Sequence, residues 1–161
     1  MKTSYLARYA LLLALAMVLS YVESQIPLSL AVPGVKLGVT NLVVIFALYR
    51  LGTKEAWMLS LVRVVLVSLT FGNAYSFWYS LAGAVLSLAV MTVLRRLHWL
   101  GDLGVSVAGA VCHNLGQIAV AMVVLRSTAV VYYLPVLLAS GVAAGVCIGA
   151  VAAVLVRRIV W

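Results

Sequence analysis

Long apolar runs follow one another along this chain, with only short polar connectors between them. Hydrophobic residues make up 66% of the 161 residues and charged residues only 9%, whereas a soluble domain is about half apolar and about a quarter charged. Such a chain has too few polar residues to cover an apolar core in water. We therefore expect an integral membrane protein, and the composition excludes a water-soluble enzyme.

The spacing of the runs predicts an all-α bundle of six transmembrane helices. One crossing takes about 20 residues, so six crossings take about 120 and leave about 40 for connectors. Residues 1–161 are expected to form a single transmembrane domain. The expected helices cover residues 5–22, 37–51, 54–70, 74–94, 104–125 and 130–156, and an outer loop with two of the three prolines covers 23–36.

The basic residues predict the orientation of this bundle, because cytoplasmic loops carry an excess of Lys and Arg. With a cytoplasmic N-terminus, eight of the eleven Lys and Arg residues fall on the inner side and only Lys36 and Arg126 on the outer side. The reverse orientation would exchange these numbers, so we expect both termini to be cytoplasmic. The eight inner residues are Lys2, Arg8, Arg50, Lys54, Arg95, Arg96, Arg157 and Arg158.

The acidic residues are few and dispersed, which argues against catalysis. Glu23, Glu55 and Asp102 are the three, and no two are close in sequence. Chemistry on magnesium-bound diphosphates needs clustered carboxylates, because the hard cation prefers several oxygen ligands. Cys112 and Cys147 lack the spacing of metal ligands. We expect no enzyme activity, no metal and no cofactor, and the scattered positive charges do not predict a nucleic-acid partner.

Small residues at four-residue spacing predict where helices pack closely, because small side chains let backbones approach in lipid. One stripe lies in the sixth expected helix and another in the fifth. The first expected helix carries an AxxxA pair, Ala10 and Ala14, which gains meaning only if a partner docks there. The two stripes are Gly141, Gly145, Gly149 and Ala153, and Gly104, Ala108, Cys112 and Gly116.

Arg63 lies near the middle of the third expected helix, at a depth where a central Arg costs about 2.5–3.5 kcal/mol on translocon scales. Intramembrane ionisable residues suggest function by default. No acid is expected at a matching depth in this chain. The compensation would then come from oxygens of neighbouring helices or from an anionic ligand, and the sequence leaves a structural and a ligand-binding Arg63 both open.

The fifth expected helix carries three polar side chains at mid-membrane. His113 and Gln117 are four residues apart, and Asn114 and Gln117 three apart, so the three can share one side of a helix. They are either interhelical hydrogen-bonding groups or one wall of a polar pocket. Other polar groups accumulate in the outer half and favour an outward-facing cavity. These additional candidate binding residues are Lys36, Asn41, Asn73 and Tyr79.

Several segments are similar to a known bacterial family. They are ESQIPLSLAVPGVKLGVTNLV at 23–43, the Arg63…LTFGN run at 63–73, YSLAGAVLSLAVM at 79–91, GAVCHNLGQ at 109–117 and YYLP at 132–135. With these segments the chain resembles the Gx transporter family, also called heptaprenyl diphosphate synthase component I. That family in turn resembles the substrate-binding S-components of energy-coupling factor (ECF) transporters, which are six-helix proteins with cytoplasmic termini.

The resemblance implies a binding subunit of an ECF-type importer in the bacterial plasma membrane. The predominantly cationic candidate site predicts that its ligand is a small anionic molecule, either vitamin-like or a quinone or isoprenoid precursor. Its partners would be an ECF coupling membrane subunit, which would dock at Ala10 and Ala14, and ATPase subunits, since the chain has no P-loop. The alternative hypothesis is a non-catalytic membrane partner of a prenyl diphosphate synthase in isoprenoid or quinone biosynthesis.

Overall fold

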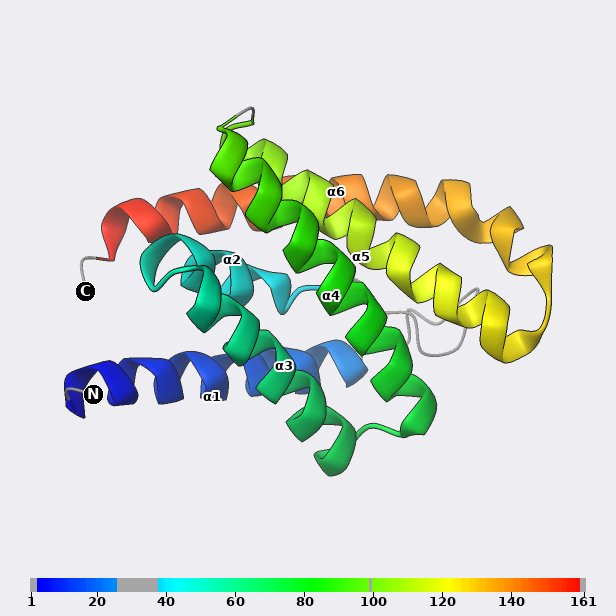
Figure 1. Ribbon diagram of the computed structural model, residues 1–161, viewed down its shortest axis with the longest axis horizontal. Helices are drawn as coiled ribbons and strands as arrows, with labels where there is room; N and C mark the ends of the chain where they lie inside the picture. The colour runs from blue at the N-terminus through cyan, green and yellow to red at the C-terminus, as the bar shows by residue number, and fades with distance from the viewer. Residues whose placement is uncertain (1–2, 26–37, 99, 160–161) are drawn as a thin grey trace.

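The computed structural model describes residues 3–25, 38–98 and 100–159. Within these ranges the chain forms six α-helices and one short 3-10 helix, with no strand, so the all-α prediction is confirmed. Figure 1 places α1 and α6 on opposite sides of the bundle, and both chain ends at the same end. The elements are α1 (Thr3–Gln25), α2 (Asn41–Arg50), α3 (Thr53–Thr70), α4 (Ala74–Leu97), α5 (Asp102–Leu125), η1 (Thr128–Tyr133) and α6 (Leu134–Arg158).

Four of these helices are long and apolar enough to cross a membrane: α1, α4, α5 and α6, the last together with η1. A helix of 24 residues such as α4 or α5 is about 36 Å long and exceeds the ~30 Å hydrocarbon core. The chain is therefore a multi-pass membrane protein. The 18-residue α3 carries three charged residues, and the 10-residue α2 is about half a crossing.

Several helix ends differ from the expected bounds by a few residues, and two of these differences bear on the candidate site. α1 continues to Gln25, so Glu23 is helical rather than part of an outer loop. The remainder of the predicted loop 23–36, with Lys36, lies outside the described residues. α2 begins at Asn41 rather than at residue 37, after a turn at Gly38, whose φ of 79° favours glycine.

The most extensive packing joins α5 to α4 on one side and to α6 on the other. A Cβ added to Gly145 of α6 would lie 2.6 Å from Cα of Val107, so the two backbones are in contact there. Ser106 Oγ also donates to the carbonyl oxygen of Gly145 at 2.8 Å. The glycine stripe predicted on α6 does face α5.

The stripe predicted on α5 is only partly correct. A Cβ on Gly116 would lie 2.7 Å from the carbonyl oxygen of Ala82, so this glycine does allow close packing on α4. For Gly104, in contrast, the three described atoms nearest to an added Cβ all belong to Leu100, just before its own helix. Gly109, which lies outside the four-residue pattern, contacts Met91 of α4 instead. The four-residue spacing misses it because α5 packs against two helices, on two different faces.

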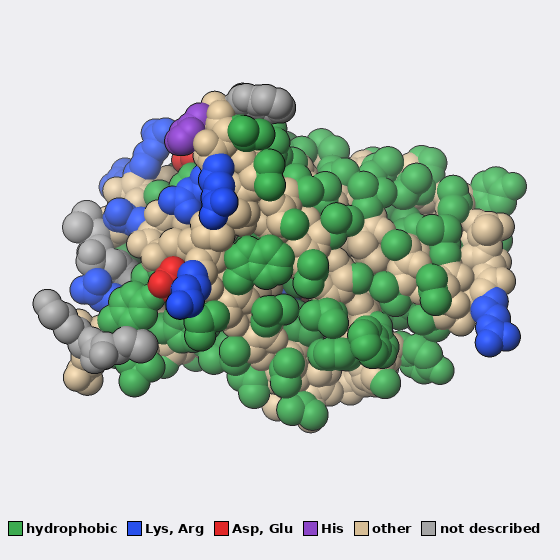
Figure 2. Space-filling model, viewed as in Figure 1, with side chains coloured by type: hydrophobic (Ala, Val, Ile, Leu, Met, Phe, Trp, Pro, Cys, Tyr) green, Lys and Arg blue, Asp and Glu red, His purple; other side chains and the backbone are tan. Residues whose placement is uncertain are grey.

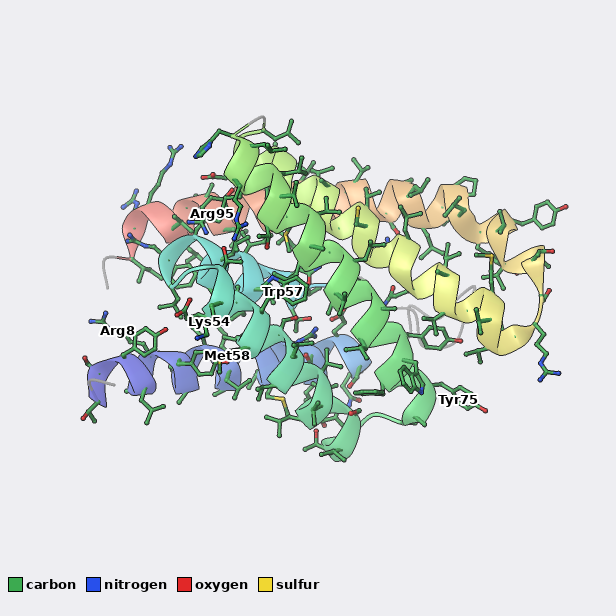
Figure 3. All side chains as sticks on the ribbon, viewed as in Figure 1. Arg8, Lys54, Trp57, Met58, Tyr75 and Arg95 are labelled. Atoms are coloured by element: carbon green, nitrogen blue, oxygen red, sulfur yellow. The ribbon has the colours of Figure 1, made fainter. Side chains whose placement is uncertain are left out.

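The charges separate along the bundle. Figure 2 shows Lys and Arg side chains gathered at the end that holds both termini, while hydrophobic side chains cover most of the visible flank. Arg8, Lys54 and Arg95 lie at that basic end in Figure 3. This distribution suits a headgroup region at one end and hydrocarbon along the flank. The cytoplasmic location of the basic end stays a prediction.

The contact between α5 and α6 predicts a large effect of one added methyl group. We expect Gly145→Ala to destabilise the bundle by about 1–3 kcal/mol, because its Cβ meets backbone that cannot move without separating the helices. Gly101→Ala is the matched control, since no described residue other than its chain neighbours lies within 4 Å of its added Cβ. Thermal unfolding of the two variants in detergent measures the difference, and equal midpoints would contradict the close contact.

Candidate functional site

Arg63 is buried inside the bundle and is only 5% exposed. Its guanidinium donates from one terminal nitrogen to Thr40 Oγ1 at 2.7 Å and to Ser20 Oγ at 3.4 Å. Among the described residues, Nε and the other terminal nitrogen of Arg63 have no hydrogen-bond partner. The side chain therefore stays among the helices instead of reaching the headgroups, and it retains donors that could bind another group.

Glu23 corrects the expectation that no acid lies at the depth of Arg63. It is 5% exposed and close enough to interact electrostatically with the guanidinium. Because α1 extends to Gln25, Glu23 lies three residues after Ser20, and the two side chains share one face of the helix. A carboxylate of this chain thus supplies part of the compensation that the sequence analysis assigned to neutral oxygens or an anionic ligand.

The turn that precedes α2 links this acid to the rest of the site. Glu23 Oε1 accepts hydrogen bonds from the backbone N–H groups of Gly38, at 2.5 Å, and Val39, at 3.4 Å. Thr40, the next residue, binds Arg63. Residues 38–40 therefore contact the end of α1 with their backbone and α3 with a side chain, and they fix the position of the carboxylate relative to the guanidinium.

Asn41 and His113 also adjoin this turn. The structure therefore brings them close to the cluster that we call the Arg63 group, which consists of Arg63, Ser20, Glu23 and Thr40. A Cβ on Gly38 would lie 3.1 Å from Asn41 Nδ2 and 3.5 Å from His113 Cδ2. A Cβ on Gly83 of α4 would lie within 3.0 Å of three atoms of the His113 ring. The imidazole thus lies between the α2 turn and α4, where two glycines leave room for it.

Asn114 faces a different neighbour from His113. Its Nδ2 donates to the carbonyl oxygen of Leu137 on α6 at 2.7 Å, and a Cβ on Gly141 would lie 2.8 Å from the same nitrogen. Gln117 is fully buried in α5. Asn114 thus makes an interhelical hydrogen bond, the structural alternative that the sequence left open, whereas His113 packs beside the Arg63 group.

Asn73 and Tyr79 have local roles in the described structure. Asn73 is exposed and caps α4, since its Oδ1 accepts from the backbone N–H of Ser76 at 2.8 Å. Tyr79 is buried in a small apolar cluster with Ala121 and Val130. Neither interaction joins these residues to Arg63, and their assignment to a binding site stays a prediction.

Ser20, Glu23 and Thr40 are site residues that the sequence analysis did not select. The sequence could have identified Ser20 and Glu23, because two polar residues three positions apart near the end of an apolar helix predict one polar face of that helix. Thr40 immediately precedes the selected Asn41. On α1, Ala10 and Ala14 are exposed in the described structure, as a docking surface requires.

The comparisons identify a family. The family model described as heptaprenyl diphosphate synthase component I matches residues 12–155, a range that reaches from α1 to α6. Comparison with curated proteins and with solved structures gives no match. Among the described residues, no three His, Cys, Asp or Glu side chains are grouped in a way that could hold a metal ion.

The pairing of Glu23 with Arg63 predicts thermodynamic coupling. We expect Glu23→Gln alone to destabilise the protein by about 1–3 kcal/mol, because a buried charge loses its counter-charge. The double variant Glu23→Gln with Arg63→Met should cost less than the sum of the single variants, by about 0.5–3 kcal/mol. Unfolding of all four proteins in detergent gives this difference.

Glu55→Gln is the control for this cycle, because Glu55 is only half-buried and lies on the first turn of α3. Its effect should add to that of Arg63→Met within about 0.5 kcal/mol. Additive costs for Glu23 and Arg63 would contradict their interaction.

Proposed function

Because this chain belongs to the heptaprenyl diphosphate synthase component I family, we propose that it is the non-catalytic membrane component that acts with a prenyl diphosphate synthase. The observation that carries this proposal is the extent of the match, residues 12–155, which spans the bundle rather than one motif. The membrane would be the plasma membrane of a bacterium.

The carboxylates of the chain support a division of labour in which the partner performs catalysis. Prenyl transfer on a magnesium-bound diphosphate requires several clustered oxygen ligands. Glu23 is engaged with the turn before α2, and Glu55 and Asp102 lie in the first turns of two different helices. Because its three acids lie at these separate positions, the chain would leave metal binding to the carboxylates of the synthase. The chain itself would attach the complex to the membrane and bind an anionic isoprenoid.

The basic end of the bundle is the surface we assign to the soluble partner. Arg96, Arg157 and Arg158 are exposed there, at the ends of α4 and α6. Charged groups of this kind steer association with a partner of opposite charge. Arg126 is exposed as well, but it follows α5 at the turn into η1.

Recovery of the synthase with the tagged full-length chain tests this proposal. We expect a prenyl diphosphate synthase, identified by mass spectrometry, to co-purify with the wild-type chain in mild detergent. Neutralising Arg96, Arg157 and Arg158 together to Gln should lower its recovery about fivefold, since rim charges act mainly on association. Arg126→Gln is the matched control and should leave recovery unchanged. Absence of any prenyl synthase from the wild-type sample would contradict the proposal.

A second function is favoured by one observation, the two Arg63 nitrogens without a partner among the described residues. A ligand-binding subunit of an ECF-type importer would use such a buried cation to receive a carboxylate or phosphate. The site would then comprise Arg63, Asn41 and His113, with Lys36 and the other predicted residues as further contacts. Glu23 already offsets part of the positive charge, which favours a ligand of low net charge.

The two functions differ in the partner recovered. The importer predicts co-purification of a coupling membrane subunit, which should be lost when Ala10 and Ala14 are both changed to Leu, because the small side chains permit close helix packing. Ala143→Leu on the exposed face of α6 is the control. Recovery of a coupling subunit that is lost in the Ala10/Ala14 variant and retained in the Ala143 variant would select the importer over the synthase partner.

A further inference from the structure

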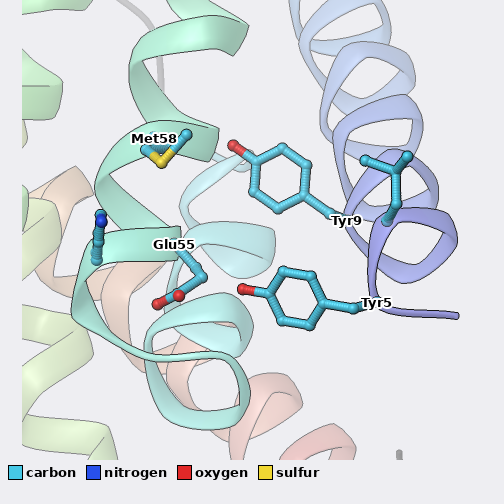
Figure 4. Close-up of a pocket in the computed structure, with 6 residues that line it drawn as sticks. Tyr5, Tyr9, Glu55 and Met58 are labelled. Carbon is cyan, nitrogen blue, oxygen red and sulfur yellow. The ribbon is translucent and has the colours of Figure 1, made fainter. Parts of the chain in front are cut away.

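A cavity lies at the basic end of the bundle, between the first turns of α1 and the start of α3. Its volume is about 630 Å³, within the range of small-molecule sites. In Figure 4, Tyr5 and Tyr9 extend from α1 toward α3, where Glu55 and Met58 face them. The lining residues are Tyr5, Leu6, Tyr9, Lys54, Glu55 and Met58.

The polar groups of this cavity carry charges of both signs. Glu55 is half-buried, faces the hydroxyl of Tyr5 (Figure 4), and interacts electrostatically with both Tyr5 and Tyr9. The Tyr9 hydroxyl is buried, without a hydrogen-bond partner among the residues the structure describes. A carboxylate beside two aromatic rings is an environment for an ammonium group. The neighbouring Lys54 supplies a point charge suited to a phosphate.

The apolar side of the cavity is exposed on the flank of the bundle that we assign to the bilayer. Leu6 is 56% exposed and Met58 is 52% exposed. A second groove of about 270 Å³ follows on α3, lined in part by Val62 and Val65. Met58, Val62 and Val65 are spaced at four and three residues, so they form one stripe along the helix. Hydrocarbon chains that leave the cavity can therefore lie along α3.

The depth of the cavity matches a lipid headgroup. Lys54 lines it, and Arg8 and Lys54 lie at the end where the basic residues gather (Figures 2 and 3); such residues mark the membrane interface. An anionic lipid or a diphosphate would place negative charge against Glu55. A zwitterionic headgroup satisfies both Glu55 and Lys54, and it leaves no charged group of the cavity without a counter-charge.

We propose that the cleft between α1 and α3 binds one phosphatidylethanolamine molecule of the bilayer. Its ammonium lies against Glu55, Tyr5 and Tyr9, its phosphate is bound by Lys54, and its acyl chains follow the apolar stripe of α3. This site is separate from the Arg63 group and goes beyond the proposed function.

Native mass spectrometry of the purified full-length chain tests this assignment. The protein in mild detergent is mixed with equal amounts of phosphatidylethanolamine and phosphatidylglycerol of the same acyl chains. We expect the wild type to retain the ethanolamine lipid about fivefold better, the size of effect that a partly exposed ammonium–aromatic contact gives. Glu55→Gln should remove this preference, whereas Lys54→Gln should lower retention of both lipids, because both carry a phosphate.

Asp102→Asn is the matched control, a carboxylate change at the start of α5 outside the cavity, and it should leave the preference unchanged. Met58→Trp keeps every charge and fills the cavity, so it should reduce retention of phosphatidylethanolamine even if Glu55→Gln does not fold. Equal retention of the two lipids by the wild type, or a preference that survives in Glu55→Gln, would overturn the proposal. If an equal concentration of soluble phosphoethanolamine displaced the bound lipid, the headgroup alone would account for binding. That result would overturn the assignment of a lipid as the occupant.

Discussion

A guanidinium buried in a membrane-spanning bundle requires compensation, and in this protein the surroundings of Arg63 meet that requirement in part. Ser20 and Thr40 accept its hydrogen bonds, and Glu23 supplies negative charge. A central arginine costs about 2.5–3.5 kcal/mol on translocon scales, and the contacts from α1 and the turn before α2 offset part of such a cost for Arg63 on α3. The two guanidinium nitrogens of Arg63 that have no hydrogen-bond partner among the described residues are available to bind a ligand.

The packing of the helices distinguishes a tight part from a more open one. α5 approaches both α4 and α6 through glycines whose added Cβ atoms would collide with backbone, and small residues of this kind permit close helix packing. α1 is less buried than α5 and contacts mainly α3 and α2. It nevertheless contributes to both sites, with Ser20 and Glu23 near its end and Tyr5 and Tyr9 near its start. A shift of α1 would therefore affect both sites together.

The two sites suit different chemistry because their charges differ. At the Arg63 site, one buried cation is partly offset by Glu23, and the Asn41 amide and the His113 imidazole adjoin the same turn, so a weakly anionic group fits. Between α1 and α3, one cation and one carboxylate lie at the basic end with aromatic and apolar side chains around them. A zwitterionic amphiphile fits there. The charge of each site, more than its volume, decides which molecule it can accept.

The sequence by itself determined the membrane-protein class, six helices, the separation of basic residues and the position of Arg63 inside a helix, because hydrophobicity and charge are summed over local segments and need no knowledge of neighbours. The pairing of Glu23 with Arg63 could not be predicted, since it depends on α1 continuing past residue 22 and on how the helix is rotated. The partners of two adjacent residues on α5 could not be predicted either. Asn114 donates a hydrogen bond to α6, whereas His113 faces α4 and the turn before α2. Only the tertiary structure decided these partners, because the direction in which a helix presents a side chain is set by packing against helices distant in the sequence.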